Sequence, residues 1–183
     1  MNRAKKIILV AHCLLNVNAK VDGLARYQGV HDEIISSLIQ KGYGIIQLPC
    51  PEMGYYGIRR WGNVFEQMDI PAYRRYCRKI LSPIVDQIQD YQKNEYEIAG
   101  VIGVDKSPSC GVHKTCCSDR YKGEITCINN LNTITNSLCY RDGQGIFIEE
   151  FHSLILETGI SIPFYAIDEE SSELTDPIHS FML

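Results

Sequence analysis

The chain alternates between continuously apolar runs and stretches whose apolar side chains recur every three or four residues. Continuous, β-branched runs are typical of strands buried on both faces of a parallel sheet. Four such runs are present, at residues 5–13, 43–52, 96–105 and 160–168. Helical spacing instead predicts helices over residues 30–42, from Pro71 to about Lys93, and over 145–159. In the first helix the apolar positions are Val30, Ile34, Ile35, Leu38 and Ile39.

This order of elements predicts a Rossmann-like α/β fold with about four parallel strands and helices on both faces. Right-handed crossovers leave few topologies, and we favour strand order 2-1-3-4. Pro163 suggests that the fourth strand lies at an edge, and Pro83 should kink or split the long helix. Residues 111–145 are expected to be an irregular loop or lid. Without repeats or linkers, residues 1–183 are predicted to form one domain.

Composition narrows the range of partners. The 183 residues are 45% hydrophobic and carry a formal net charge of −4, so a nucleic-acid polymer is not an expected ligand, although a free nucleobase is compatible. No apolar run is long enough to span a membrane. The basic and apolar N-terminus lacks the long apolar region and cleavage site of a signal peptide, so a cytoplasmic protein is expected.

Three of the eight cysteines follow three different predicted strands. Cys13 ends the first, Cys50 ends the second, and Cys110 lies a few residues beyond the third. In open α/β sheets, ligands bind beyond the carboxyl ends of the strands. These cysteines are therefore predicted to meet at one site, although three unrelated packing cysteines would give the same sequence.

Three thiolates would bind a soft metal centre. Zinc, copper(I) and iron–sulfur clusters all suit such ligands, and a [4Fe–4S] cluster with only three cysteines would leave one iron open. Cys116 or Cys117 could supply a fourth ligand and close the cluster. Cys77 lies among core positions of the long helix and is expected to pack there. Cys127 and Cys139, in the 111–145 region, could bind a second metal or have no such role.

Three short motifs occur at these positions. They are AHCLLN at 11–16, CPE at 50–52 and GVDKSPSCG at 103–111. In this order they resemble the TudS family of thiouracil desulfidases, in its single-domain, TudS-related branch. The resemblance implies a [4Fe–4S] cluster on Cys13, Cys50 and Cys110, with Glu52 and Ser107 as catalytic residues. It also implies a small thiocarbonyl substrate that loses its sulfur without a redox step.

The segment after the CPE motif departs from the family pattern. It contains Arg59, Arg60 and Trp61, whose side chains suit stacking on a heterocycle or pairing with an anion, but a plain surface loop is an equal alternative. DGQG at 142–145 could bind an anion at the start of the last helix, or simply end a loop. A non-catalytic sensor or binding module with an iron–sulfur or zinc site is the alternative to an enzyme.

Overall fold

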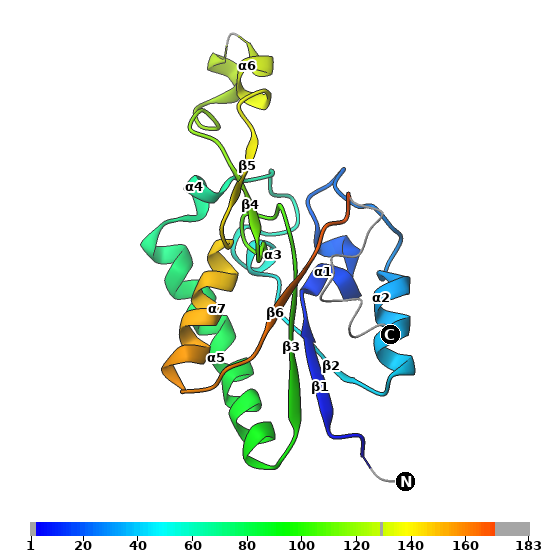
Figure 1. Ribbon diagram of the computed structural model, residues 1–183. Helices are drawn as coiled ribbons and strands as arrows, with labels where there is room; N and C mark the ends of the chain where they lie inside the picture. Colours follow the sequence, from blue (N-terminus) through cyan, green and yellow to red (C-terminus); the bar gives the residue numbers. More distant parts are fainter. Residues whose placement is uncertain (1–2, 129, 171–183) are drawn as a thin grey trace.

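A four-stranded parallel sheet forms the centre of the computed structural model, which describes residues 3–128 and 130–170 (Figure 1). Its strands are β1 (Lys6–Val10), β2 (Gly44–Gln47), β3 (Glu97–Val104) and β6 (Phe164–Ile167). Their order is β2-β1-β3-β6, and every neighbouring pair is parallel. The predicted fold class, the order 2-1-3-4 and the edge position of the last strand are therefore confirmed.

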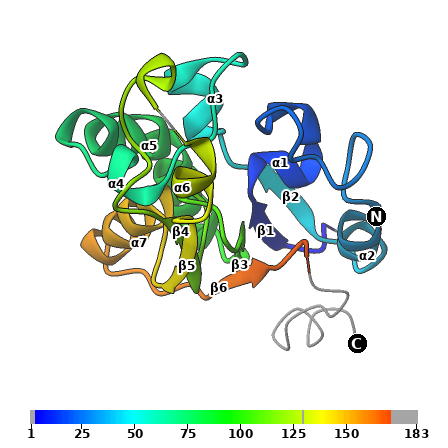
Figure 2. The same ribbon diagram turned by 90° about the horizontal axis from the view of Figure 1, so that it is seen from above.

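Helices cover both faces of the sheet, as predicted. Helices α5 (Pro71–Lys93) and α7 (Ile146–Glu157) lie on one side, and α1 (His12–Leu15) and α2 (Asp32–Gln40) lie on the other (Figure 2). Alternate residues of β1 enter two separate apolar clusters, with Leu9 facing α5 and α7 and Ile8 facing α2. This alternation explains why the whole strand is apolar.

Helix α2 is shorter than its apolar pattern suggests. Ile34, Ile35 and Leu38 are buried, but Val30 and Ile39 are 40% and 62% exposed. Val30 precedes the first turn, because the helix begins at Asp32, and Ile39 projects to solvent near its end. The helix predicted over residues 30–42 is therefore shorter at both ends, and two of its five apolar positions do not join the buried face.

Helix α5 runs without a break through Pro83, so the predicted split is wrong. Pro83 lies on the exposed side, whereas Leu81 and Val85 on either side of it are buried in the core. Packing of the apolar face on both sides of the proline holds the two halves in one helix. Cys77 is fully buried on the same face, which confirms its packing role. No helix within residues 3–128 and 130–170 is long and apolar enough to cross a membrane.

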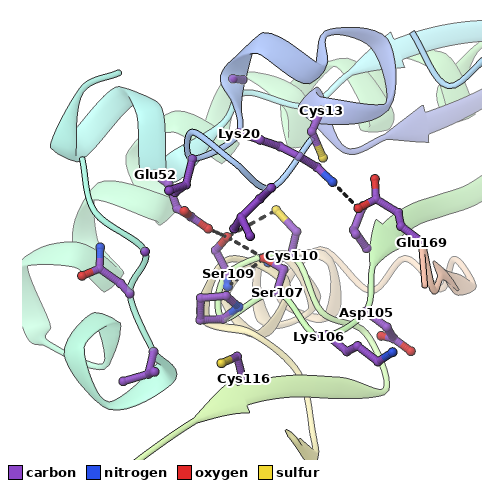
Figure 3. Close-up of a pocket in the computed structure, with 18 of the residues that line it drawn as sticks. Cys13, Lys20, Glu52, Asp105, Lys106, Ser107, Ser109, Cys110, Cys116 and Glu169 are labelled. Atoms are coloured by element: carbon purple, nitrogen blue, oxygen red, sulfur yellow. Dashed lines mark hydrogen bonds and ion pairs between the residues drawn. The ribbon is translucent and has the colours of Figure 1, made fainter. Parts of the chain in front are cut away.

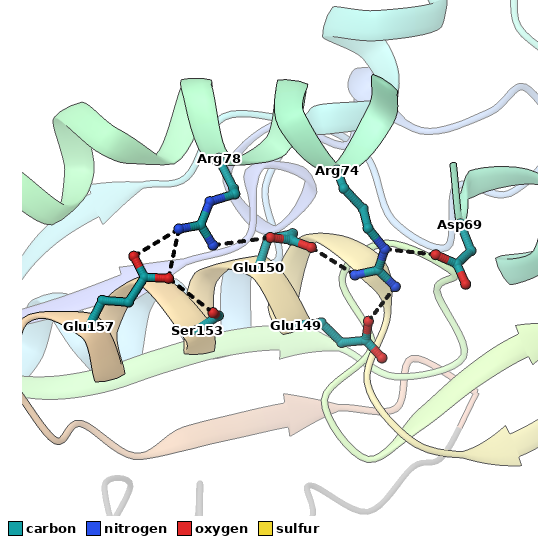
Figure 4. A network of polar contacts seen from close by, with 7 residues as sticks. All are labelled: Asp69, Arg74, Arg78, Glu149, Glu150, Ser153 and Glu157. Carbon is teal, nitrogen blue, oxygen red and sulfur yellow. Dashed lines mark hydrogen bonds and ion pairs between the residues drawn. The ribbon is translucent and has the colours of Figure 1, made fainter. Parts of the chain in front are cut away.

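Ion pairs join α5 to α7 along their exposed border (Figure 4). Arg74 bonds to Glu149 and Glu150 at 2.8 and 2.7 Å, and Arg78 bonds to Glu150 and Glu157. Glu150 thus accepts from both arginines. This network fixes the register of α7, whose first turn borders the candidate site.

The 111–145 region is more regular than predicted. It contains an antiparallel pair of strands, β4 (Lys114–Cys117) and β5 (Cys139–Asp142), which the sequence analysis missed. Between them lie a 3₁₀ turn, η2 (Ile125–Cys127), and helix α6 (Leu131–Thr135). Figure 1 shows this hairpin projecting beyond the carboxyl ends of the parallel strands, on the side where a ligand of an α/β sheet is expected.

The remaining short elements surround that same end of the sheet. They are the 3₁₀ helix η1 (Val17–Ala19), α3 (Pro51–Tyr56) and α4 (Phe65–Met68).

Candidate functional site

A cavity of about 450 Å³ opens at the carboxyl ends of β1, β2 and β3. Cys13, Cys50 and Cys110 all line it (Figure 3 labels Cys13 and Cys110). Its volume falls in the range of small-molecule sites, roughly 300–1,000 Å³. The structure therefore brings together the three cysteines that the strand pattern placed at one rim, and their role as ligands stays a prediction.

Cys13 and Cys50 are each positioned by a short helix. Cys13 lies in the first turn of α1, directly after β1, where burial raises the pKa of its thiol to about 12 and the nearby Lys20 ammonium opposes the rise. Cys50 is the N-cap of α3, and its Sγ accepts a hydrogen bond from the Met53 N–H at 3.4 Å. Burial raises the Cys50 pKa, and the Met53 N–H partly offsets this. Both thiols are thus protonated at neutral pH, and a metal that bound them would have to displace the proton.

Cys110 is held in a tight loop after β3. Asp105 Oδ1 accepts hydrogen bonds from three backbone N–H groups, those of Val112, His113 and Lys114, at 2.9, 2.8 and 3.2 Å. Ser107 Oγ accepts from the Cys110 N–H at 3.0 Å. Burial raises the pKa of Cys110 well above its ordinary value, and the neighbouring Cys13 and Cys50 thiols add to the rise. All three cysteines line the same cavity.

The first residues of α7 hold the same loop in place through backbone hydrogen bonds. The N–H groups of Ile146 and Phe147 donate to the carbonyls of Pro108 and Ser109, both at 3.0 Å, and the Gly145 N–H donates to Gly111 at 2.9 Å. A side chain at Gly145 would meet the Ser109 carbonyl carbon at 2.6 Å, so only glycine allows this approach. DGQG therefore supports the cysteine loop, and these N–H groups are not available to an anion.

Glu52 faces the cavity two residues after Cys50 (Figure 3). Ser109 Oγ donates to its Oε1 at 2.6 Å, and Arg60 Nε pairs with its Oε2 at 3.3 Å. The side chains of Glu52 and Arg60 are only 13% and 4% exposed. The carboxylate is consequently fixed in position and compensated by a neighbouring positive charge.

Ser109, the second serine of SPSCG, was not among the predicted site residues. It contacts Glu52 directly, whereas the predicted Ser107 reaches Glu52 only through Ser109, with 3.2 Å between the two hydroxyl oxygens. Ser107 mainly caps the cysteine loop through the N–H groups of Ser109 and Cys110. The two serines alternate along the chain, and this spacing was the available signal that they share a side of the loop.

Only one of the three predicted substrate-binding residues lines the cavity. Arg60 does so, and its Nη2 also donates to the Ala19 carbonyl at 2.7 Å. Arg59 is exposed, and Trp61 is 75% exposed outside the cavity lining.

A fourth cysteine, Cys116, enters the same cavity from β4. Its pKa is raised to about 11, by burial first and then by Cys139 and Glu66. Cys117 is buried on the opposite side of β4, and Cys127 is exposed on η2. Within the part of the chain that the structure describes, Cys116 is thus the one additional thiol that lines the cavity.

The wall facing Glu52 is built from ion pairs. Lys20 pairs with Glu169, close to Cys13 (Figure 3). Lys106 pairs with Asp168 at 2.8 Å. Among residues 3–128 and 130–170, no group of three histidines, cysteines or acidic residues is assembled to hold a single ion. The cavity is instead lined by three free thiols from segments that follow three neighbouring strands, and thiolates are the ligands that soft metal centres take.

Comparison with known proteins identifies a relative but no activity. No family model matches the chain, and no solved structure matches it either. The chain is 42% identical over 112 residues to "Uncharacterized protein MJ0003" of Methanocaldococcus jannaschii, an alignment that covers 61% of this chain and 71% of that protein. The resemblance to thiouracil desulfidases therefore stays a prediction.

Proposed function

The chain belongs to the family of the uncharacterized protein MJ0003, and from the cavity at the carboxyl ends of β1, β2 and β3 we propose that it is an iron–sulfur-dependent desulfidase acting on a small thiocarbonyl compound. The observation that carries the proposal is the meeting of Cys13, Cys50 and Cys110 with Glu52 in one cavity. The motifs around these residues resemble those of TudS thiouracil desulfidases, which supports a thiouracil-like substrate.

The three cysteines would hold a [4Fe–4S] cluster. When bound, the cluster would supply an iron without a protein ligand, which acts as a Lewis acid toward the sulfur of the substrate. Three thiol protons must leave when it binds, because the thiols are protonated in the metal-free protein and thiolates are the ligands.

Glu52 would accept the proton of the attacking water. The overall reaction exchanges sulfur for oxygen: the thiocarbonyl and water give a carbonyl and hydrogen sulfide, with no change of oxidation state. Ser109 donates to one oxygen of the carboxylate and Arg60 holds the other, so the base is oriented before substrate binds. The Lys20–Glu169 wall closes the other side of the cavity.

Cluster content tests the ligand assignment. Cys13, Cys50 and Cys110 are each replaced by alanine, the proteins are reconstituted anaerobically, and iron and acid-labile sulfide are measured per chain. We expect all three variants to lose the cluster and the exposed Cys127→Ala control to keep it. Retention of the full cluster by Cys13→Ala or Cys110→Ala would overturn the assignment.

Activity tests the reaction. The reconstituted protein should release sulfide from 2-thiouracil or a related cyclic thioamide without added reductant, because hydrolysis needs none. The metal-free protein should release none. Equal rates with and without the cluster would remove it from the mechanism.

One observation favours the alternative, a non-catalytic sensor or binding module with an iron–sulfur or zinc site. Cys116 reaches the same cavity and could become a fourth ligand. In that case Cys116→Ala would lose metal as Cys13→Ala does, and sulfide release would be absent in both the variant and the parent. Retention of iron by Cys116→Ala supports the open site that the enzyme needs.

A further inference from the structure

Two cysteines outside the predicted ligand set face each other across the β4–β5 hairpin. Cys117, the last residue of β4, pairs directly with Cys139, the first residue of β5. Their sulfurs are 2.8 Å apart, and both cysteines are free. Each thiol also lies within hydrogen-bonding distance of the other residue's carbonyl, at 3.4 and 3.3 Å.

We propose that Cys117 and Cys139 form a reversible disulfide that fixes the β4–β5 hairpin, which forms one wall of the cavity. The bond requires the sulfurs to approach by less than about 1 Å, since the S–S distance in a disulfide is near 2.04 Å. Directly opposed residues of an antiparallel pair already have the β-carbon separation that a disulfide needs, within about 1 Å. Little backbone movement is therefore required.

The neighbouring cysteines are poor alternatives for this bond. Cys116 precedes Cys117 on β4, so its side chain points to the other face, where it lines the cavity. Cys127 lies on η2, away from the paired rung formed by Cys117 and Cys139. The register of the hairpin thus selects one pair from the four cysteines of this region.

The two cysteines differ in solvent exposure, and this difference determines which of them reacts first in forming the disulfide. Cys139 is exposed, whereas Cys117 is only 6% exposed. A low-molecular-weight disulfide, RSSR, would therefore meet Cys139 first. The Cys139 thiolate attacks one sulfur of RSSR, forms a mixed disulfide and releases one thiol. The Cys117 thiolate then displaces the second thiol. In sum, two cysteine thiols are oxidised by two electrons and RSSR is reduced to two RSH.

Closure of this bond would tether residues on both sides of the pair. Leu138 and Tyr140 flank Cys139 in the sequence, and Tyr121 follows Cys117 by four residues; all three line the cavity. The hairpin is already docked beside the cavity, because Arg141 lies over the Phe65 ring at 4.2 Å and Glu66 accepts from the Ser118 N–H. The disulfide would join the two strands at the base of the 118–138 loop. Local opening of this loop should therefore be rarer in the oxidised protein than in the reduced one.

Peptide mapping of the full chain tests the proposal without any substitution. The protein is equilibrated with glutathione disulfide, quenched by alkylation and digested without reduction. We expect one cross-linked species that joins the peptides of Cys117 and Cys139, and its loss on treatment with excess dithiol. A cross-link from Cys139 to Cys116 or Cys127, or stable glutathione adducts on both cysteines, would overturn the assignment.

Hydrogen exchange then tests the consequence for the wall. Amides of residues 118–138 should exchange at least several-fold more slowly in the oxidised protein than in the reduced one. Cys139→Ser should remove this difference, and the Cys127→Ser control should preserve it. Equal exchange in the two wild-type forms would show that the bond does not order the wall. None of these readouts depends on the cluster or on sulfide release.

Discussion

At the scale of single residues, Glu52 is the group on which the proposed chemistry depends. It is held between the Ser109 hydroxyl and the Arg60 guanidinium at the edge of the cavity. Glu52→Gln keeps the size of the side chain but removes the basic oxygen. We expect turnover to fall by roughly 10²–10⁴, the usual contribution of a general acid or base, while iron per chain stays at the parental level. Unchanged turnover would assign Glu52 a structural role only.

The two serines of the cysteine loop should behave differently. Ser109→Ala removes the donor to Glu52 and should lower turnover about 10- to 100-fold, the worth of a hydrogen bond to a charged group, with iron retained. Ser107→Ala leaves the N–H groups of Ser109 and Cys110 without their acceptor, so it should lower stability and iron content together. Parallel measurement of iron and sulfide release separates the two effects. The reverse pattern would restore Ser107 as the residue that acts with Glu52.

Strand-end placement predicted that Cys13, Cys50 and Cys110 line one cavity, because the carboxyl ends of neighbouring parallel strands share one edge. Cys116, which follows no parallel strand, also lines it. The finer choices were not predictable. Arg60 rather than Arg59 reaches Glu52, and Ser109 rather than Ser107 donates to it. Both outcomes depend on how two loops close against each other, which neither periodicity nor spacing encodes.

At the scale of elements, the contact between α7 and the cysteine loop couples the fold to the site. Gly145→Ala would place a methyl group 2.6 Å from the backbone of Ser109, which cannot rotate away. We expect a loss of about 1–3 kcal/mol in the free energy of unfolding and a clear fall in iron content. Gly62→Ala is the matched control, because no atom lies within 4 Å of its added methyl group. Thermal unfolding and iron analysis of both variants test this prediction. Equal behaviour of the two variants would contradict the role of the α7 contact in supporting the cysteine loop.

Element prediction succeeded where one face or both faces of a segment are buried. Strands β1 and β3 and helices α5 and α7 carry their burial pattern in the sequence. The β4–β5 hairpin does not, because each strand has four residues and all four of β5 are exposed. The predicted break at Pro83 failed for a related reason. A proline breaks a helix only when the flanking turns lack packing, and here Leu81 and Val85 provide it.

At the scale of the whole molecule, three distant parts of the chain close one wall of the cavity. The segment after β6 supplies Asp168 and Glu170, which pair with Lys106 at 2.8 and 2.7 Å. Glu170 also pairs with Arg26 at 3.1 Å, so the loop after α1, the loop after β3 and the end of the sheet meet here. No local pattern predicts these contacts, because the partners are 62 to 144 residues apart.

The pH dependence of stability should report this wall. Burial alone would raise the pKa of Asp168, but the hydrogen bond and charge of Lys106, together with the hydrogen bond from the Glu170 N–H, lower it below its ordinary value. The hydrogen bond from the same lysine also lowers the pKa of Glu170. Carboxyls with lowered pKa values contribute stability that is present above their unfolded pKa, near 4, and lost as the pH falls through the folded value. Lys106 has a raised pKa, so its own contribution persists below about pH 10.

We therefore expect Lys106→Met to be less stable than the parent by about 1 kcal/mol or less, because these side chains are partly exposed. The difference should be constant from about pH 5 to 9 and should shrink below about pH 4, as Asp168 and Glu170 take up protons. Denaturant unfolding of both proteins across this range measures it, with the exposed Lys79→Met of α5 as the control. A difference that persists undiminished at pH 3 would mean that Lys106 stabilises the wall by packing on the Tyr140 ring, 5.4 Å from its ammonium, and not by its charge pairs.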